Sequence, residues 1–424
     1  MTDVLEDRGL ATAEDRFRAA KAASTRLATA TTLERNRGLE AIADALLART
    51  EEVIAANADD LAAARTSGLS EGLIDRLTLD ERRVAALADA VLAIVRLPDP
   101  VGDVVRGSTL PNGLQLTQVR VPFGVIGAIY EARPNVTVDI TALALKSGNA
   151  VVLRGGTAAQ HSNAALVAVI QDALASTGLP AGAVQTVDEF GREGAAALMR
   201  ARGLVDLLVP RGSAGLIKAV VEESTVPVIE TGAGVVHVFL DESADVEMAT
   251  SIVLNSKTHR VAVCNAAETL LVHAAAAERL LPPVVSALQE AGVVLHADER
   301  TRAIVPDLEV AGDDDWAAEY YSLDLAVAVV DDLDAAMGHI DAWSTHHTES
   351  IVTESVRSAE RFLAEVDSAV VMVNASTRFT DGGEFGFGAE VGISTQKLHA
   401  RGPMGLQELT STKWLVRGSG QIRA

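Results

Sequence analysis

Residues 124–153 read GVIGAIYEARPNVTVDITALALKSGNAVVL, and this stretch decides the fold. Its first seven residues form an apolar run, which predicts a buried strand. Pro134 then occupies the position that proline favours at the start of a helix, and Ser147-Gly-Asn149 contains the glycine that commonly ends one. A second apolar run, Ala150-Val-Val-Leu153, follows at once. The stretch therefore predicts a strand, a helix and a second strand.

The same alternation extends through most of the chain. A helical pattern covers 157–175, and further short apolar runs begin at Val184, Val205 and Val226. A second series of strands and helices fills 235–380. Alternation of this kind builds parallel sheets with helices on both faces, and such sheets bind ligands at the carboxyl ends of their strands. The expected fold class is α/β, with two doubly wound α/β domains.

The segments on either side of this alternation have other patterns. Residues 1–97 are rich in Ala and Leu at helical spacing, which predicts a helical cover. Residues 104–120 contain Asn112-Gly113 followed by period-two alternation, which predicts a β-hairpin. The edges of such a hairpin need a cover, which either a partner subunit or the chain itself could supply. The glycine density of 381–392 predicts a tightly folded loop near a ligand or an interface.

Composition excludes several classes of function. The chain has 424 residues and a formal net charge of -22, which argues against a general affinity for nucleic acid or for an anionic membrane surface. A single cysteine cannot form an internal disulfide, and no apolar run has the roughly 18 residues expected of a membrane span. The polar, acidic N-terminus has no signal-peptide core. The cytoplasm is therefore the expected location.

The single cysteine, Cys264, is the strongest candidate for chemistry. Lys257, His259 and Arg260 precede it, and nearby cations favour the nucleophilic thiolate form of a cysteine. The alternative is that Val261-Ala-Val-Cys264 is a buried segment with an inert thiol, since free cysteine is among the most buried residue types. The segment alone leaves both readings open.

Two glycine turns predict a site for a phosphate-bearing cofactor. Arg154-Gly155-Gly156 and Arg211-Gly212-Ser213 each join a predicted strand to a predicted helix. Glycine lets the backbone approach a phosphate closely, a helix N-terminus attracts anions, and arginine suits phosphate recognition. Each turn alone is a weak signal, and neither is a G-x-G-x-x-G fingerprint or a P-loop. No spacing typical of a metal site occurs in the sequence.

Taken together, several long stretches resemble the γ-glutamyl phosphate reductases, a branch of the aldehyde dehydrogenase superfamily. The resemblance covers essentially the whole chain and is strongest at 122–137, 146–156, 255–260, 335–348 and 385–395. It implies NADPH-dependent reduction of L-glutamyl 5-phosphate to L-glutamate 5-semialdehyde and phosphate, a step of proline biosynthesis, through a thioester on the cysteine.

The resemblance also assigns roles to individual residues. Cys264 matches the superfamily's catalytic thiol, and Glu230 matches the position of its catalytic glutamate. Gly212-Ser213 matches the pyrophosphate-binding turn, and Arg154, with Gly155 and Gly156 after it, falls where the superfamily contacts the adenosine ribose. Glu319 falls where a glutamate holds the nicotinamide ribose. Because Arg commonly accommodates a 2′-phosphate, Arg154 favours NADPH over NADH. Arg133, Lys257, Arg260 and Arg378 are the expected anion partners of the substrate.

Two departures from the superfamily pattern leave alternatives open. Ala132 replaces the asparagine that usually helps to bind the oxyanion, so Asn135 and Asn265 are the candidate substitutes, beside the backbone N–H of Cys264. The segment after Glu230 also differs from that of the hydrolytic enzymes, so Glu230 either takes the proton of Cys264 or has a structural role. The two rival functions are a hydrolytic aldehyde dehydrogenase and a non-catalytic protein with this fold.

The resemblance further implies a domain plan and partners. Residues 1–106 with 121–234 form the expected cofactor-binding domain, and 235–384 the expected catalytic domain. Residues 107–120 with 403–424 form an expected oligomerisation element of a homodimer or homotetramer. The upstream glutamate kinase is a candidate partner.

Overall fold

The computed structural model describes residues 12–423 and contains two compact units. Unit 1 comprises Met1–Glu230, Phe387–Gly392 and Met404–Ala424, and unit 2 comprises Thr231–Gly386 and Ile393–Pro403. Each unit contains a parallel sheet with helices, as the alternation predicts. No helix within residues 12–423 has the length and apolar character needed to cross a membrane.

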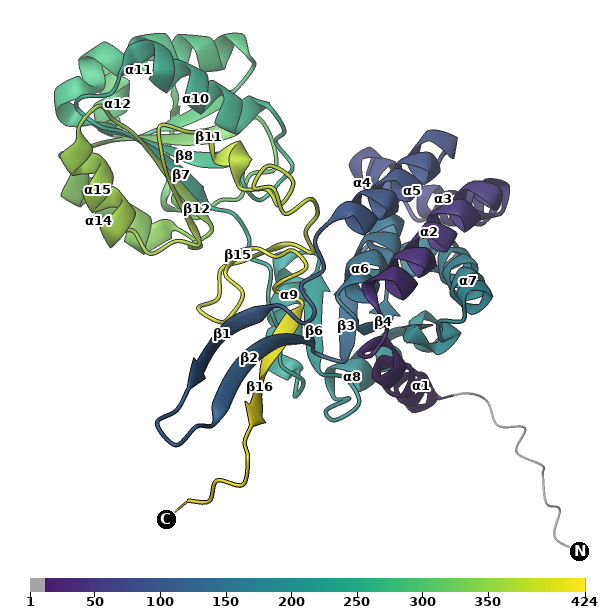
Figure 1. Cartoon of the computed structure of the whole chain (residues 1–424). Coiled ribbons are helices and arrows are strands. Elements are labelled where there is room, and N and C mark those ends of the chain that lie inside the picture. The colour runs from purple at the N-terminus through teal and green to yellow at the C-terminus, as the bar shows by residue number, and fades with distance from the viewer. Residues whose placement is uncertain (1–11, 424) are drawn as a thin grey trace, which may run out of the picture. The chain divides into compact units, whose positions relative to one another are not determined.

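Unit 1 begins with the expected helices (Figure 1). Two of them start in capping boxes. The side chains of Thr12 and Thr31 each accept a hydrogen bond from the backbone N–H three residues later, and the backbone N–H of each Thr donates to the carboxylate of that later residue. The prediction for 1–97 is confirmed from Thr12 onward, and its first residues lie outside the described part. The five helices are α1 Ala13–Leu27, α2 Thr32–Ala48, α3 Thr50–Thr66, α4 Glu71–Leu77 and α5 Glu81–Arg96.

The sheet of unit 1 has four parallel strands in the order β5-β4-β3-β6. Its strands are β3 Val125–Tyr130, β4 Ala150–Arg154, β5 Val184–Thr186 and β6 Leu207–Arg211, and its main helices are α6 Pro134–Lys146, α7 Gln160–Thr177, α8 Gly191–Met199 and α9 Ala214–Glu223. Helix α6 has the bounds that the sequence predicts. The strand expected at Val226 is only an isolated bridge between Val228 and Leu208, because Pro227 has no N–H with which to extend a ladder.

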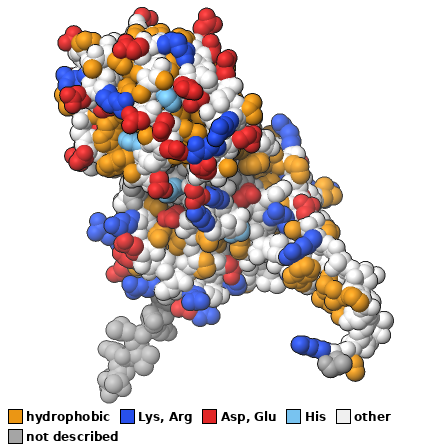
Figure 2. All heavy atoms as spheres, turned by 90° about the vertical axis from the view of Figure 1, so that its left-hand side faces the viewer, with side chains coloured by type: hydrophobic (Ala, Val, Ile, Leu, Met, Phe, Trp, Pro, Cys, Tyr) orange, Lys and Arg blue, Asp and Glu red, His pale blue; other side chains and the backbone are white. Residues whose placement is uncertain are grey.

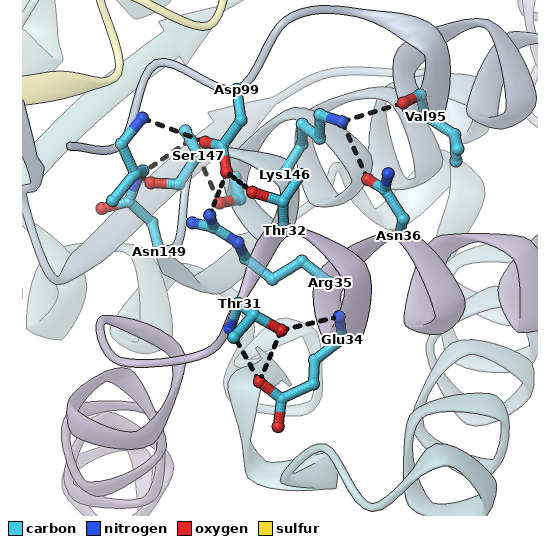
Figure 3. A network of polar contacts seen from close by, with 12 residues as sticks. Thr31, Thr32, Glu34, Arg35, Asn36, Val95, Asp99, Lys146, Ser147 and Asn149 are labelled. Atoms are coloured by element: carbon cyan, nitrogen blue, oxygen red, sulfur yellow. Dashed lines mark hydrogen bonds and ion pairs between the residues drawn. The ribbon is translucent and has the colours of Figure 1, made fainter. Parts of the chain in front are cut away.

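A buried polar network fastens the N-terminal helices to the last turn of α6 (Figure 3). Arg35 of α2 pairs with Asp99, and both side chains are almost wholly buried. The Lys146 ammonium, on the last turn of α6, donates to Asn36 Oδ1 and to the Val95 carbonyl, both at 2.8 Å. These bonds hold helices α2 and α5 against α6, the helix between strands β3 and β4.

The predicted hairpin is present, and the chain itself covers one of its edges. Strands β1 Val104–Thr109 and β2 Gln115–Pro122 are antiparallel, and β16 Thr410–Arg417 pairs with the other side of β2. The turn places Gly113 at φ +89°, a conformation that favours glycine. The prediction of a partner subunit therefore concerns the outer edges of β1 and β16, since the order is β1-β2-β16.

Unit 2 contains a seven-stranded parallel sheet in the order β10-β9-β11-β8-β7-β12-β13. The strands are β7 Val236–Leu240, β8 Ala267–His273, β9 Val294–Ala297, β10 Glu309–Val310, β11 Asp324–Val330, β12 Thr348–Val352 and β13 Val370–Val373. The helices are α10 Val246–Thr258, α11 Ala274–Glu290, α12 Glu299–Ile304, α13 Asp313–Trp316, α14 Leu333–Trp343 and α15 Val356–Glu365, and the short η4 Thr377–Phe379 and β14 Ile393–Ser394 with β15 Gly402–Pro403 complete the unit.

Alternate residues of the unit 2 strands enter two separate cores. Val238 of β7 packs with α10 and α11, whereas its neighbour Phe239 packs with α14 and α15. Figure 1 shows these two pairs of helices on opposite faces of the sheet. A strand that is buried on both faces is apolar throughout, which is why these strands appear in the sequence as continuous apolar runs.

Candidate active site

Cys264 lies at the amino edge of the unit 2 sheet. Helix α10 ends at Thr258, and a short loop with a turn at Cys264 leads into β8. The thiol residue is half-buried. The inert alternative requires a thiol enclosed in an apolar interior, and Cys264 is not enclosed in this way. Strands β11, β8 and β7 are adjacent and parallel, so the segments that precede them meet at this same edge.

Gly234 and Glu319 meet the thiol loop at this edge. A Cβ atom on Gly234 would lie 1.6 Å from the carbonyl oxygen of Cys264, so only glycine fits there. The backbone N–H of Gly234 donates to Glu319 Oε1 at 2.9 Å, and the Tyr321 hydroxyl donates to Glu319 Oε2 at 2.5 Å. The structure thus brings together Cys264 and Glu319, which lie far apart in the sequence.

Two arginines and a histidine lie near the thiol loop. Arg378 Nε donates to His259 Nδ1 at 3.3 Å. The pKa of Arg378 is lowered, first by burial and then by the nearby Arg260, whereas Asp381 and Cys264 act in the opposite direction. Arg260 and Arg378 therefore provide positive charge near the thiol, and their expected role as anion partners of the substrate remains a prediction.

Asn265 braces the loop. Its side-chain amide nitrogen donates to the Thr380 carbonyl at 2.9 Å and to that of Arg378 at 3.5 Å, while its backbone carbonyl accepts from Thr377 Oγ1 at 2.7 Å. Both amide hydrogens are thus directed at backbone oxygens. Asn265 is consequently occupied as a donor, which leaves Asn135 as the asparagine candidate for the oxyanion.

The expectation that Lys257 binds a substrate anion needs correction. Lys257 lies on the last turn of α10, where its side chain has 0% exposure and its ammonium pairs with Glu268 at 2.6 Å. A fully buried cation with a carboxylate partner cannot receive an anion from solvent. The sequence offered no signal for Glu268, which looks like an ordinary strand residue.

In unit 1, the two glycine turns lie at the carboxyl edge of the sheet. Arg154 ends β4, Arg211 ends β6, and β3 runs between them, so the turns flank Glu131, the residue after β3. The backbone N–H of Ser213, at the start of α9, donates to Glu131 Oε2 at 3.0 Å. A Cβ atom on Gly212 would lie 2.6 Å from that oxygen. The turn therefore already holds an anionic oxygen, and the residues fit the phosphates of a dinucleotide cofactor.

Arg154 and Gly155 have a neighbour that the sequence did not reveal. Asp188, which follows β5, accepts from the Gly155 backbone N–H at 2.6 Å and from Asn163 Nδ2 at 3.1 Å. Burial raises the pKa of Asp188 to about 6, and Arg154 is among the groups that oppose this shift. The Arg154 Nε donates to the Gly191 carbonyl at 3.3 Å. Gly156 packs beside the backbone of Ala132, the nearest atom to an added Cβ being 3.3 Å away.

The other candidates of unit 1 lie at the ends of its elements. Arg133 immediately precedes α6 and Asn135 lies in its first turn, where Asn135 Nδ2 donates to Asp139 Oδ2 at 3.0 Å. Glu230 is half-buried and is the last residue of the first segment of unit 1. The roles expected for Arg133, Asn135 and Glu230 remain predictions.

Two parallel-sheet units, one with paired glycine turns and one with a thiol at a sheet edge, are the arrangement expected of an aldehyde dehydrogenase, which is a class of oxidoreductase. Residues 5–304 match the model of the aldehyde dehydrogenase family, and the chain belongs to this family. The chain is 69% identical over 405 residues to the γ-glutamyl phosphate reductase of Clavibacter michiganensis subsp. michiganensis, covering 96% of this chain and 94% of that protein. Within the family, it belongs to the γ-glutamyl phosphate reductases.

Solved structures agree with this assignment. The crystal structure of γ-glutamyl phosphate reductase from Thermotoga maritima has a TM-score of 0.96 and 46% identity, covering 97% of this chain and 100% of that one. An acetylating aldehyde dehydrogenase from Geobacillus thermoglucosidasius, with a TM-score of 0.69 and 19% identity over 97% of each chain, shares the fold alone. The expected α/β, aldehyde dehydrogenase-like fold class and the expected family are confirmed.

Proposed function

We propose that this protein reduces L-glutamyl 5-phosphate to L-glutamate 5-semialdehyde and phosphate with NADPH, through a thioester on Cys264, as a step of proline biosynthesis. The observation that carries the proposal is the placement of Cys264. The cysteine is half-buried at a sheet edge, where Gly234 links its loop to the Glu319 carboxylate and where Arg260 and Arg378 provide positive charge. The high identity to proteins named for this reaction supports the same substrate.

Cys264 performs the first chemical step. Positive charge from Arg260 and Arg378 stabilises the thiolate, which attacks the acyl carbonyl carbon of the substrate. A sulfur–carbon bond forms, the bond from that carbon to the phosphate oxygen breaks, and phosphate leaves with the electron pair. The same two arginines can hold the departing phosphate, because a guanidinium binds two oxygens at once. Lys257 takes no part in this contact.

A bound nicotinamide cofactor supplies the hydride that converts the acyl group on Cys264 into the aldehyde. In unit 1, the backbone N–H of Ser213 and the turn at Gly212 would hold the pyrophosphate, and Glu131 would yield its hydrogen bond there. Arg154, Gly155 and Gly156 would receive the adenosine ribose and its 2′-phosphate, which favours NADPH. In unit 2, Glu319 would hold the nicotinamide ribose, with Tyr321 and Gly234 fixing its carboxylate.

Two residues of unit 1 retain alternative roles in the reaction. Glu230 either takes the proton from the Cys264 thiol or supports the backbone at its position. Asn135 is proposed to donate to the carbonyl oxygen that becomes negative, together with the Cys264 backbone N–H, and Arg133 to bind a carboxylate of the substrate. The Asn135 amide is already aligned by Asp139.

Phosphate dependence tests the proposal against a hydrolytic aldehyde dehydrogenase. The purified protein is given glutamate semialdehyde and NADP⁺, and the absorbance of NADPH is followed with and without inorganic phosphate. We expect reduction of NADP⁺ only when phosphate is present, because phosphate must release the acyl group from Cys264. Reduction without phosphate would reject acyl-phosphate chemistry in favour of hydrolysis. Absence of any reduction, with Cys264 alkylated at the same rate with and without NADPH, would favour a non-catalytic protein.

The assembly is part of the proposal. We expect a homodimer or a homotetramer in which the outer edges of β1 and β16 are covered by a partner subunit, since open strand edges invite pairing. Light scattering over a range of protein concentrations measures the mass, and a monomer at every concentration would contradict this. The upstream glutamate kinase is a candidate partner because acyl phosphates are readily lost to water.

A further inference from the structure

A fully buried ion pair spans the base of the thiol loop. Lys257 lies on the last turn of α10 and Glu268 lies on β8, four residues after Cys264. Both side chains have 0% exposure, and Lys257 Nζ lies 2.6 Å from Glu268 Oε2. Residues 259–266, which carry His259, Arg260 and Cys264, connect the two partners. The ion pair therefore joins the helix before this loop to the strand after it.

The pair also contacts the segment that carries Glu319. The ring of Tyr320 lies 5.6 Å from Lys257 Nζ, within the range of a cation–π contact. The other carboxylate oxygen of Glu268, Oε1, is buried and has no hydrogen-bond partner among the described residues. Tyr320 is itself fixed, because its hydroxyl donates to Asp315 Oδ1 at 2.8 Å and its ring stacks on His296. One ion pair thus joins α10, β8 and the segment that presents Glu319 and Tyr321.

Stability alone is a weak explanation for such a pair. Burial raises the pKa of Glu268 and lowers that of Lys257, and in each case the charge of the partner opposes the effect of burial. Desolvation of both ions offsets most of their attraction, so replacing a buried pair by neutral side chains of similar size is often neutral or stabilising. A buried ion pair that is also hydrogen-bonded favours one arrangement of its partners, because the hydrogen bond is directional.

We propose that Lys257 and Glu268 are positioning residues that lock the Cys264 loop to the Glu319 segment. The pair sets the thiol and the carboxylate proposed for the cofactor ribose in one arrangement, although neither Lys257 nor Glu268 touches the reactants. This inference rests on the proposed function. It assigns a role in the reaction to two residues that lie outside the set of reacting groups.

The test uses the neutral double variant Lys257→Met/Glu268→Gln, which removes both charges and nearly keeps the side-chain volumes. We expect a melting temperature at or above that of the single variant Glu268→Gln, in which a buried ammonium has lost its carboxylate. We expect kcat to fall roughly 10- to 100-fold, the scale by which small misplacements reduce enzymatic rates, and KM for NADPH to rise. The rate of Cys264 alkylation by iodoacetamide without cofactor should change as well.

Three readouts keep the outcomes distinct. Wild-type kcat, KM and alkylation rate in a folded double variant would overturn the proposal, since the pair would then be merely structural. Failure of the double variant to fold would also overturn it, because the pair would then be a requirement of the fold. If the wild-type protein shows no phosphate-dependent reduction, the proposed function fails, yet the alkylation rate and the affinity for NADPH measured by fluorescence still test the positioning role.

A matched control is available in the same unit. Arg361 pairs with Asp334 on the outer surface of α14 and α15, at 2.6 Å and far more exposed than Lys257. We expect Arg361→Met to leave alkylation, kcat and KM within about twofold of the wild type, as exposed pairs contribute little. A loss in this control equal to that in the double variant would show that the readouts report general destabilisation.

Discussion

The tightest contact in the site leads to a sharp prediction for Gly234→Ala. An added Cβ would lie 1.6 Å from the Cys264 carbonyl oxygen, 2.4 Å from its carbonyl carbon and 2.8 Å from its Cα, all of which are backbone atoms. Real Cβ atoms essentially never come within 3.0 Å of another heavy atom, so the thiol loop or Gly234 must shift by more than an ångström. No side-chain rotation relieves the overlap.

Two consequences follow from this shift. Overpacking of a well-packed site costs about 1–3 kcal/mol of unfolding free energy. A displacement of about 1 Å at reacting groups can reduce the rate roughly 100-fold. We therefore expect kcat to fall about two orders of magnitude while the protein still folds. KM for the cofactor should rise too, because the Gly234 N–H no longer holds Glu319 in place.

The matched control is Gly338→Ala in helix α14. An added Cβ there meets no atom within 4 Å, and alanine favours helix over glycine by about 1 kcal/mol. This variant should be slightly more stable and fully active. Thermal melts and phosphate-dependent NADP⁺ reduction, measured in parallel, separate the two effects. A Gly234→Ala protein with wild-type kcat would refute the placement of Gly234 against the thiol loop.

Three further predictions concern single residues. Cys264→Ala should abolish turnover while leaving the melting temperature and NADPH binding unchanged, and residual turnover would exclude the thioester. Arg154→Ala should raise KM for NADPH more than KM for NADH in steady-state assays; equal effects would reject the 2′-phosphate assignment. Burial raises the pKa of Asp139 from 3.8 to about 6. Between pH 3.8 and pH 6 the folded state keeps a proton that the unfolded state releases, so the free energy of unfolding of the wild type declines as the pH rises through this range. Asp139→Asn should remove this decline, a gain of roughly 3 kcal/mol at pH 7 in denaturant titrations, and a gain independent of pH would contradict it.

The negative net charge of the chain is compatible with an anionic substrate because charge is arranged locally. Figure 2 shows acidic and basic side chains interspersed over the face that it presents. Within unit 2, His259, Arg260 and Arg378 gather at the thiol loop, although the chain as a whole carries a net charge of -22. Screening by salt limits surface charges to about 10 Å, so the local cluster dominates at the site.

Local patterns in the sequence determined the elements of this protein. The bounds of α6 could be predicted from Pro134 and from Ser147-Gly-Asn149, because the start and the end of a helix depend on residues within a turn of them. The parallel strands could be predicted from their apolar runs, and the turns at Gly155 and Gly212 from glycine. The candidate thiol needed only that Cys264 is the single cysteine of the chain.

The tertiary structure alone decided which of these residues meet. Cys264, Gly234 and Glu319 come together because β8, β7 and β11 are neighbours in the sheet, and strand order is set by packing between segments far apart in the chain. Lys257 shows the same limit. Its position near Cys264 in the sequence indicates a partner for the substrate, whereas the last turn of α10 directs its side chain inward to Glu268. A short sequence separation shows that residues are near one another, but the direction of a side chain depends on the helix and the core into which it packs.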